Sequence, residues 1–180
     1  AHGGDINKMA KKSGQIRQFT EKILQSADHV IAVGEELATT IEKSFNVPND
    51  KITVMSMGID RNVFKKTEDK KQCAVQLGMD PEKTNFLFVG NIIREKGVAE
   101  LIQAFNKVAE SVPGQSALYC VGSTKDTNFT SKAKELANGN ADIHFIEPMP
   151  QPELARYFQA ADVFVLPSYI EGLGLVALEA

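Results

Sequence analysis

Two glutamates flank a glycine turn near the end of the sequence, and together they could bind a ligand that carries both phosphates and hydroxyl groups. Glu171 lies just before the turn, Gly172 and Gly174 form it, and Glu179 lies in the helix-forming stretch that follows. A strand, a glycine turn and a helix in this order present backbone N–H groups at a helix N-terminus, where the dipole favours an anion such as phosphate. Ionised carboxylates accept hydrogen bonds from hydroxyl groups. The pattern therefore indicates a site for phosphate and sugar together.

The same turn is open to two other interpretations. Residues 172–177 also fit the dinucleotide-binding pattern G-x-G-x-x-A. That pattern opens a first βαβ unit and is followed by an acidic residue about 20 positions later, whereas here it closes the sequence. A tight turn that needs small residues, with two surface glutamates, is the structural alternative. The turn taken alone does not decide between ligand binding and a purely structural role.

The elements before the turn predict an α/β protein. Short apolar runs predict strands at 29–33, 52–56, 86–90, 117–122, 143–146 and 163–167. Apolar residues at helical spacing predict helices at 13–25, 37–45, 70–78, 98–108, 129–137 and 152–161, and one after Gly174. Strands that read as continuous apolar runs and alternate with helices indicate a Rossmann-like parallel sheet covered by helices on both faces.

Composition excludes several classes of protein. The net charge of −3 argues against general nucleic-acid binding. Cys73 and Cys120 lie far apart in the sequence, which excludes a disulfide framework and fits a cytoplasmic location. No apolar run approaches the roughly 20 residues of a membrane-spanning helix. The basic face of the 13–25 helix could contact anionic lipid, although a solvated face explains it better.

Loops at one edge of the predicted sheet are the expected place for a ligand, because ligands of parallel sheets bind beyond the carboxyl ends of the strands. These loops are 90–97, 122–124, 147–150 and 168–174. The first contains Arg94 and Lys96 near a helix N-terminus, where basic residues oppose the helix dipole unless an anion is present. They could simply be exposed, but their position on the same edge as the glycine turn favours phosphate binding.

Several motifs in order resemble the retaining glycosyltransferases of family 4, which have the GT-B fold. The glutamates match the E-x7-E signature of that family, and the stretch from Val89 to Gly97 and Pro167-Ser168 match other parts of it. His2-Gly3-Gly4-Asp5 and 56–60 resemble motifs of its N-terminal domain. The resemblance covers nearly the whole chain. It implies a GT-B type fold truncated at both ends, and the missing initiator Met and the unfinished last helix also suggest a fragment.

Domains and site residues follow from this resemblance. It implies that residues 1–60 are the remnant of an acceptor-side domain and 72–180 an incomplete nucleotide-sugar-binding domain; the stretch 61–71 between them is predicted to be a linker because it is strongly charged. It assigns the diphosphate to Lys96 with Arg94, and the donor sugar to Glu171 and, across the cleft, to His2. The remaining donor-binding residues implied by the family are Gly90, Asn91, Gly122, Pro148, Met149, Gly172, Leu173, Gly174, Leu175, Val176 and, for the ribose hydroxyls, Glu179.

Two features limit the transfer of these roles. The family often has arginine directly after the glycine of the first loop, where this chain has Asn91, so Arg94 is only a candidate replacement. The sequence contains no D-x-D motif, and its three histidines and two cysteines form no ligand cluster, so we expect neither a metal nor another cofactor. His29 and His144 lie on predicted strands and are expected to be packed or edge residues, and Cys120 to be a core residue.

The resemblance implies an enzyme that transfers a sugar from a nucleotide-diphospho-sugar to a carbohydrate or lipid-linked acceptor, with retention of configuration. The setting it suggests is cell-surface polysaccharide or glycoconjugate biosynthesis in the cytoplasm, with a peripheral contact of the full-length protein at the inner face of the membrane. Two alternatives stay open: a GT-B sugar-nucleotide epimerase and a non-catalytic nucleotide-binding module. A nucleotide without sugar would not need Glu171, so the role of Glu171 separates the last from the others.

Overall fold

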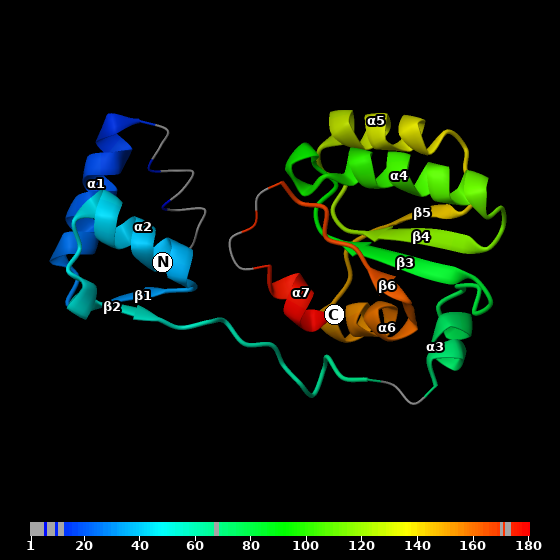
Figure 1. Cartoon of the computed structure of the whole chain (residues 1–180), viewed down its shortest axis with the longest axis horizontal. Helices are drawn as coiled ribbons and strands as arrows, with labels where there is room; N and C mark the ends of the chain where they lie inside the picture. The colour runs from blue at the N-terminus through cyan, green and yellow to red at the C-terminus, as the bar shows by residue number, and fades with distance from the viewer. Residues whose placement is uncertain (1–5, 7–9, 11–12, 67–68, 170, 172–173) are drawn as a thin grey trace. The chain divides into compact units, whose positions relative to one another are not determined.

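The computed structural model describes residues 6, 10, 13–66, 69–169, 171 and 174–180 of the 180-residue chain. Two compact units are present (Figure 1). The first comprises Ala1–Gly58 with Glu171–Leu175, and the second comprises Ile59–Ile170 with Val176–Ala180. The His2 motif and the glycine-turn residues Gly172 and Leu173 lie outside the described residues.

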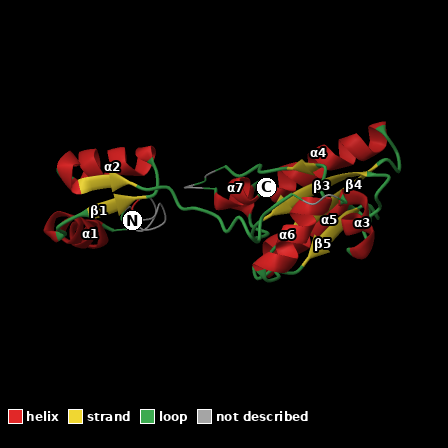
Figure 2. Cartoon of the chain, turned by 90° about the horizontal axis from the view of Figure 1, so that it is seen from below, coloured by secondary structure: helices red, strands yellow, loops and turns green. Residues whose placement is uncertain are grey.

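The first unit is a short α/β arrangement. Its elements are α1 (Gly14–Ser26), β1 (Val30–Ala32), α2 (Glu35–Phe45), the 3-10 turn η2 (Asn49–Lys51) and β2 (Ile52–Val54). The two strands run parallel and lie side by side (Figure 2). Ser13 caps α1 by accepting a hydrogen bond from the N–H of Ile16 (3.2 Å), which a helix N-terminus requires. Leu37, Ile41 and Phe45 of α2 form the buried core with the strands.

The second unit contains a four-stranded parallel sheet in the order β5-β4-β3-β6. Its strands are β3 (Thr84–Val89), β4 (Ser116–Val121), β5 (Ile143–Ile146) and β6 (Val163–Phe164). Its helices are α3 (Lys70–Gln76), the 3-10 turn η3 (Arg94–Lys96), α4 (Val98–Ser111), α5 (Thr127–Ala137) and α6 (Gln151–Ala160); α7 (Leu175–Glu179) follows the glycine turn. This is the α/β parallel-sheet architecture that the sequence predicted.

Helices cover both faces of this sheet, with α4 and α5 on one face and α3 and α6 on the other (Figure 1). Successive side chains of a strand point to opposite faces, so β3 supplies both cores. Phe88 is fully buried in the core beneath α4 and α5, and its neighbour Leu87 is fully buried in the core beneath α3 and α6. This alternation explains why the strands read as continuous apolar runs in the sequence.

The helix predicted at 70–78 is α3, which begins at Lys70 because Asp69 caps it by accepting a hydrogen bond from the N–H of Gln72 (2.8 Å). The segment before it contacts α6: the ring of Phe64 meets that of Phe158 edge-on, with centroids 5.9 Å apart. The last strand was expected over 163–167 but pairs only at Val163 and Phe164.

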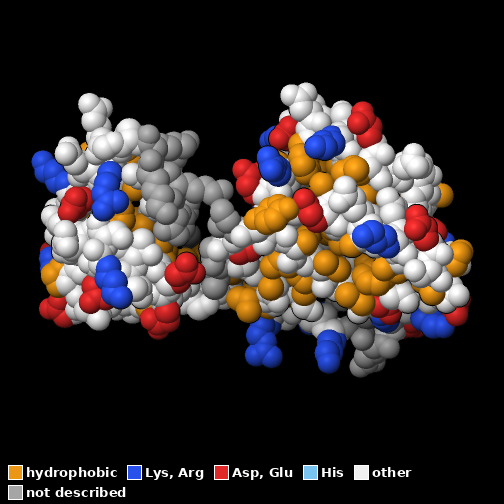
Figure 3. Space-filling view, turned by 45° about the horizontal axis from the view of Figure 1, so that its top comes forward, with side chains coloured by type: hydrophobic (Ala, Val, Ile, Leu, Met, Phe, Trp, Pro, Cys, Tyr) orange, Lys and Arg blue, Asp and Glu red, His pale blue; other side chains and the backbone are white. Residues whose placement is uncertain are grey.

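Two further findings concern the charges on the molecular surface and the length of the helices. Charged side chains of both signs are interspersed with hydrophobic ones on the face shown in Figure 3, so this view shows no continuous basic stripe. None of the helices among the described residues is long and apolar enough to cross a membrane.

Candidate functional site

Four loops meet at the carboxyl edge of the sheet in the second unit, because its strands are parallel and each loop follows a strand end. Main-chain hydrogen bonds tie them together. The N–H of Gly90 donates to the carbonyl of Val121 (3.0 Å), and that of Ile92 to the carbonyl of Ser123 (2.9 Å). The N–H of Gly122 donates to the carbonyl of Ile146 (2.9 Å). The loops after β3, β4 and β5 therefore form one continuous backbone surface.

Gly122 allows this close approach. A Cβ atom placed at Gly122 would come within 2.6 Å of the carbonyl carbon of Gly90 and closer still to its oxygen. No side chain other than hydrogen fits between the two loops, where Gly122 is buried and Gly90 is half-buried. The glycine at position 122 therefore lets the two loops pack backbone against backbone.

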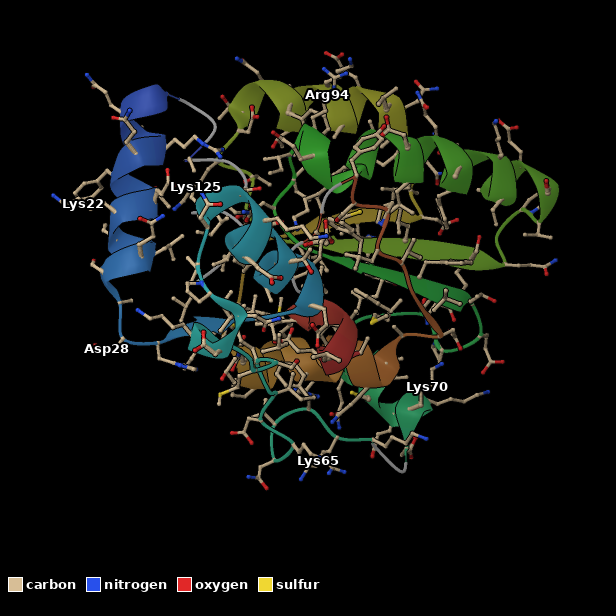
Figure 4. All side chains as sticks on the ribbon, turned by 60° about the vertical axis from the view of Figure 1, so that its left-hand side comes forward. Lys22, Asp28, Lys65, Lys70, Arg94 and Lys125 are labelled. Carbon is tan, nitrogen blue, oxygen red and sulfur yellow. The ribbon has the colours of Figure 1, made fainter. Side chains whose placement is uncertain are left out.

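The turn from Gly90 to Gly97 carries the positive charges of the site. Ile92 is fully buried and anchors the turn, while Arg94 and Asn91 are exposed and Lys96 is half-buried. Arg94 and Lys96 both belong to η3, which ends directly before α4. Figure 4 shows Arg94 on the side of the sheet that α4 covers. The predicted placement of two cations next to a helix N-terminus is therefore what the structure shows.

The N-terminus of α4 has no side-chain cap. Its N-cap residue is Gly97, with φ of 66°, and no side-chain hydrogen bond is made there. The helix dipole of this 14-residue helix favours an anion, and the carboxylate of Glu100 in its first turn, which accepts a hydrogen bond from its own backbone N–H, already meets part of that preference. An anion at this point would be met by the helix N-terminus and by the cations of η3.

Met149 and Glu147 lie in the loop after β5, which the resemblance assigned to the base. Met149 packs against the core between the sheet, α3 and α6, so part of its surface is already used. Glu147 accepts a hydrogen bond of 2.9 Å from the hydroxyl of Thr124 in the neighbouring loop. Sequence reasoning missed this pair. The available signal was a hydroxyl residue shortly after one strand and a carboxyl residue directly after the next strand in the chain.

Glu179 lies in a different environment from the turn. It lines a cavity of about 450 Å³ together with Phe64, Lys65, Lys66, Lys70, Ala155, Phe158, Gln159, Ala161, Leu178 and Ala180. Burial raises the pKa of Glu179 above its ordinary value. The described residues that line this cavity include none from the turn at 90–97. Figure 4 shows Lys65 and Lys70 on the opposite side of the sheet from Arg94.

Glu171, Gly174 and Leu175 belong by their contacts to the first unit, whereas the loops described above belong to the second. Glu171 is half-buried, and α7 begins at Leu175. Pro148 is exposed in the loop after β5. The donor-binding roles that the resemblance assigned to these residues and to Val176 stay predictions.

The remaining titratable candidates are structural. The ring of His144 stacks on that of Tyr119, with centroids 4.7 Å apart, and the Nε2 atom of His29 lies 2.7 Å from the hydroxyl of Thr53. Cys120 is fully buried in the sheet, and burial raises its pKa to about 12. Cys120 is thus the core residue that the sequence predicted, whereas His29 and His144 are exposed and His144 lies on β5, an edge strand of the sheet. Within the described part of the chain, no group of three or more His, Cys, Asp or Glu residues could hold a metal ion.

Comparison with known proteins agrees with this fold. The family model described as "Glycosyl transferases group 1" matches residues 69–180. The chain belongs to this family, whose members among the solved structures have the GT-B fold.

Individual relatives include two curated proteins and one solved structure. D-inositol 3-phosphate glycosyltransferase of Thermobispora bispora is 33% identical over 89% of this chain and 39% of its own length. Alpha-maltose-1-phosphate synthase of Mycolicibacterium smegmatis is 30% identical over 92% of this chain and 44% of its own. Sucrose-phosphate synthase of Thermosynechococcus elongatus superimposes with a TM-score of 0.76 at 25% identity, over 96% of this chain and 43% of that one. The chain thus spans about two fifths of the length of these relatives.

Proposed function

We propose that the protein is a glycosyltransferase that transfers a sugar from a nucleotide-diphospho-sugar donor to a carbohydrate or lipid-linked acceptor, with retention of anomeric configuration. The observation that carries the proposal is the turn from Gly90 to Gly97. It joins two cations, the uncapped N-terminus of α4 and the glycine backbone of two loops at one edge of a parallel sheet. Membership of the Glycosyl transferases group 1 family supplies the reaction class.

The chemistry of the turn suits the leaving group of this reaction. Cleavage of the donor leaves negative charge on a nucleoside diphosphate. In this proposal Lys96, Arg94 and the dipole of α4 stabilise that charge electrostatically. Arg94 supplies a second cation three residues beyond Asn91, where the family often has arginine. No metal is needed for this stabilisation, and we propose that none is used.

Glu171 and Glu179 are proposed to bind different sugars of the donor. In this proposal Glu171 accepts hydrogen bonds from the transferred sugar, which His2 also contacts, and Glu179 accepts them from the ribose. The assignment of Glu171 is supported by a nearby contact with the turn: the N–H of Tyr169 donates a hydrogen bond to the carbonyl of Glu95 (3.0 Å). The assignment of Glu179 rests on the E-x7-E spacing.

Named relatives support a nucleotide-sugar donor without identifying it. HepE of Anabaena, solved with UDP-glucose, superimposes on this chain with a TM-score of 0.79 at 18% identity, over 98% of this chain and 48% of its own. At 18% identity, this likeness shows a shared fold and nothing more. We propose that the setting is polysaccharide or glycoconjugate biosynthesis in the cytoplasm, with the full-length protein in peripheral contact with the membrane.

Titration calorimetry of the 180-residue chain with matched ligands tests the proposal. The ligands are UMP, UDP and UDP-glucose. The matching monophosphate, diphosphate and diphospho-glucose of adenosine and of guanosine complete the set, and each ligand is titrated with and without a chelator. We expect diphosphates to bind more tightly than monophosphates, one nucleotide sugar to bind more tightly than its diphosphate, and the chelator to change nothing. A chain that bound nucleotides with no gain from the sugar would fit the non-catalytic module instead. Failure to bind any nucleotide at millimolar concentration would contradict the proposal.

A further inference from the structure

The charged stretch between β2 and α3 begins with a turn that its own first residue closes. The carboxylate of Asp60 accepts a hydrogen bond from the N–H of Asn62 (2.8 Å). The carbonyl of Asp60 accepts two more, from the N–H groups of Val63 (3.1 Å) and Phe64 (2.9 Å). Aspartate commonly closes turns in this way, by bonding to the backbone two residues further on. The stretch therefore starts with a defined turn, although a run of charged residues is more typical of an open, solvated chain.

The same stretch is anchored on α6 by two contacts, both within the second unit. Phe64 is only 8% exposed, and its ring meets that of Phe158 edge-on, with centroids 5.9 Å apart. A buried aromatic pair in this arrangement stabilises a contact beyond the area that it buries. Next to it, the side-chain amide of Gln159 donates a hydrogen bond of 2.9 Å to the carbonyl of Lys65. The backbone at 64–65 is thus held by a ring on one side and by a hydrogen bond on the other.

The four residues directly before this stretch have no such anchors. In the described part of the chain, residues 56–59 make no hydrogen bond from main chain to main chain. Ser56 and Gly58 are exposed, and Met57 and Ile59 are half-buried. A Cβ atom at Gly58 would meet nothing within 4 Å. Segments with few contacts open most easily, and hinges are typically a few loop residues that absorb changes in φ and ψ.

We propose that residues 60–66 are an anchored segment of the second unit, held on α6 by Phe64, and that the connection between the two units bends at a hinge formed by residues 56–59. This division is independent of the sugar-transfer reaction proposed above. It makes Phe64 the residue that sets the length of the hinge. Without its ring, the region that bends would extend from residue 56 through the anchored segment.

Trypsin compares the two segments within one molecule. Arg61 is a natural cleavage site in the anchored segment, and Ser56→Lys adds a site in the hinge. Cleavage of a folded chain follows the population of locally opened forms. Each rate is divided by the rate at the same site in a peptide of residues 52–66, which removes the effect of neighbouring residues on the protease. We expect the 180-residue chain to be cleaved about tenfold faster or more after position 56 than after Arg61. Equal corrected rates would overturn the proposal.

Phe64→Ala tests the anchor in the Ser56→Lys background. We expect the corrected rate at Arg61 to rise about tenfold or more, toward that at position 56, because the opened form of the segment becomes populated. Phe19→Ala is the matched control, since it removes the same side chain from a position that is 67% exposed. A protection of Arg61 that Phe64→Ala leaves unchanged would disprove the role of Phe64.

Gln159→Leu gives a second, milder test if circular dichroism shows that Phe64→Ala unfolds the second unit. It removes the hydrogen bond to the carbonyl of Lys65 and keeps a side chain of similar size on α6. We expect cleavage at Arg61 to become about 3- to 10-fold faster, the range for one lost hydrogen bond, and cleavage after position 56 to stay the same. An equal change at both sites, or none at Arg61, would show that α6 does not hold the segment.

Discussion

Gly122 packs against the backbone of Gly90 so closely that a Cβ atom at position 122 would come within 2.6 Å of the Gly90 carbonyl carbon. This contact joins the loops after β3 and β4 at the edge where the cationic turn lies. Both loops belong to adjacent, fully paired strands, so neither can move away without breaking the β3–β4 ladder. The geometry of the site thus depends on the absence of a side chain.

Gly122→Ala should therefore destabilise the second unit. The added methyl group forces the two loops apart, and overpacking of this kind costs about 1–3 kcal/mol of unfolding free energy. Urea unfolding followed by circular dichroism measures it. Gly14→Ala is the matched control, because a Cβ atom there meets nothing within 4 Å. Equal midpoints for the wild type and Gly122→Ala would contradict the assignment of Gly122 as a required glycine.

The sheet and its ligand-binding edge could be predicted because they depend on local patterns. Apolar runs such as 86–90 mark buried parallel strands, and the order of strands and helices places the following loops at one edge. The last strand was predicted too long. Val165 still donates to the carbonyl of Leu87 (2.8 Å), but Pro167 has no N–H to continue the ladder.

The side-chain pairs at the edge could not be predicted, because they depend on how separate loops approach each other. Thr124 and Glu147, for example, are 23 residues apart in the sequence. The cavity around Glu179 is similar: it combines residues of the expected linker with α6, and the linker was assigned from its charge alone. The sequence suggested the residue types that bind a donor, and the structure shows which of them share a loop.

Lys96→Ala should reduce the preference for diphosphates over monophosphates. If Lys96 meets the distal phosphate, its loss weakens UDP binding by roughly tenfold, as expected for one hydrogen bond to a charged group, and changes UMP binding much less. Lys107→Ala is the control, since it removes the same charge from an exposed position further along α4. Arg94→Ala should act like Lys96→Ala only if Arg94 supplies the second cation. A UDP-to-UMP ratio that Lys96→Ala leaves unchanged would disprove the assignment.

Cys120 should be unreactive in the folded chain. With a pKa of about 12, only about one thiol in 10,000 is ionised at pH 8, and the side chain is fully buried. Cys73 is also buried. Labelling with a thiol reagent at pH 8 should therefore be slow in buffer and fast in urea, with the urea midpoint following that of circular dichroism. Rapid labelling of Cys120 in buffer would show that the sheet opens locally.

Glu179 should make stability depend on pH in a defined direction. Burial raises its pKa, so the folded state binds this proton more tightly than the unfolded state. Its contribution is then most favourable at low pH and declines as the pH rises from the ordinary pKa through the raised one. We expect Glu179→Gln to gain stability relative to the wild type at about pH 7 and to show a smaller difference at about pH 4. Urea unfolding at both pH values measures this, with exposed Glu135→Gln as the control. A gain that was the same at both pH values would not come from this proton.

The two glutamates should act on different parts of the donor. Glu179→Gln should weaken binding of UDP itself if Glu179 accepts from the ribose hydroxyls, by about 1.5–3 kcal/mol for a hydrogen bond to a charged group. Glu171→Gln should leave UDP binding nearly unchanged and remove the gain that the sugar provides. Calorimetry of both variants with UDP and the preferred nucleotide sugar gives the four affinities that are needed. The cavity that Glu179 lines with Lys65 and Lys70 makes this a demanding test of the E-x7-E assignment. If Glu179→Gln changes stability with pH as argued above but leaves UDP affinity unchanged, Glu179 serves the fold and only Glu171 serves the donor.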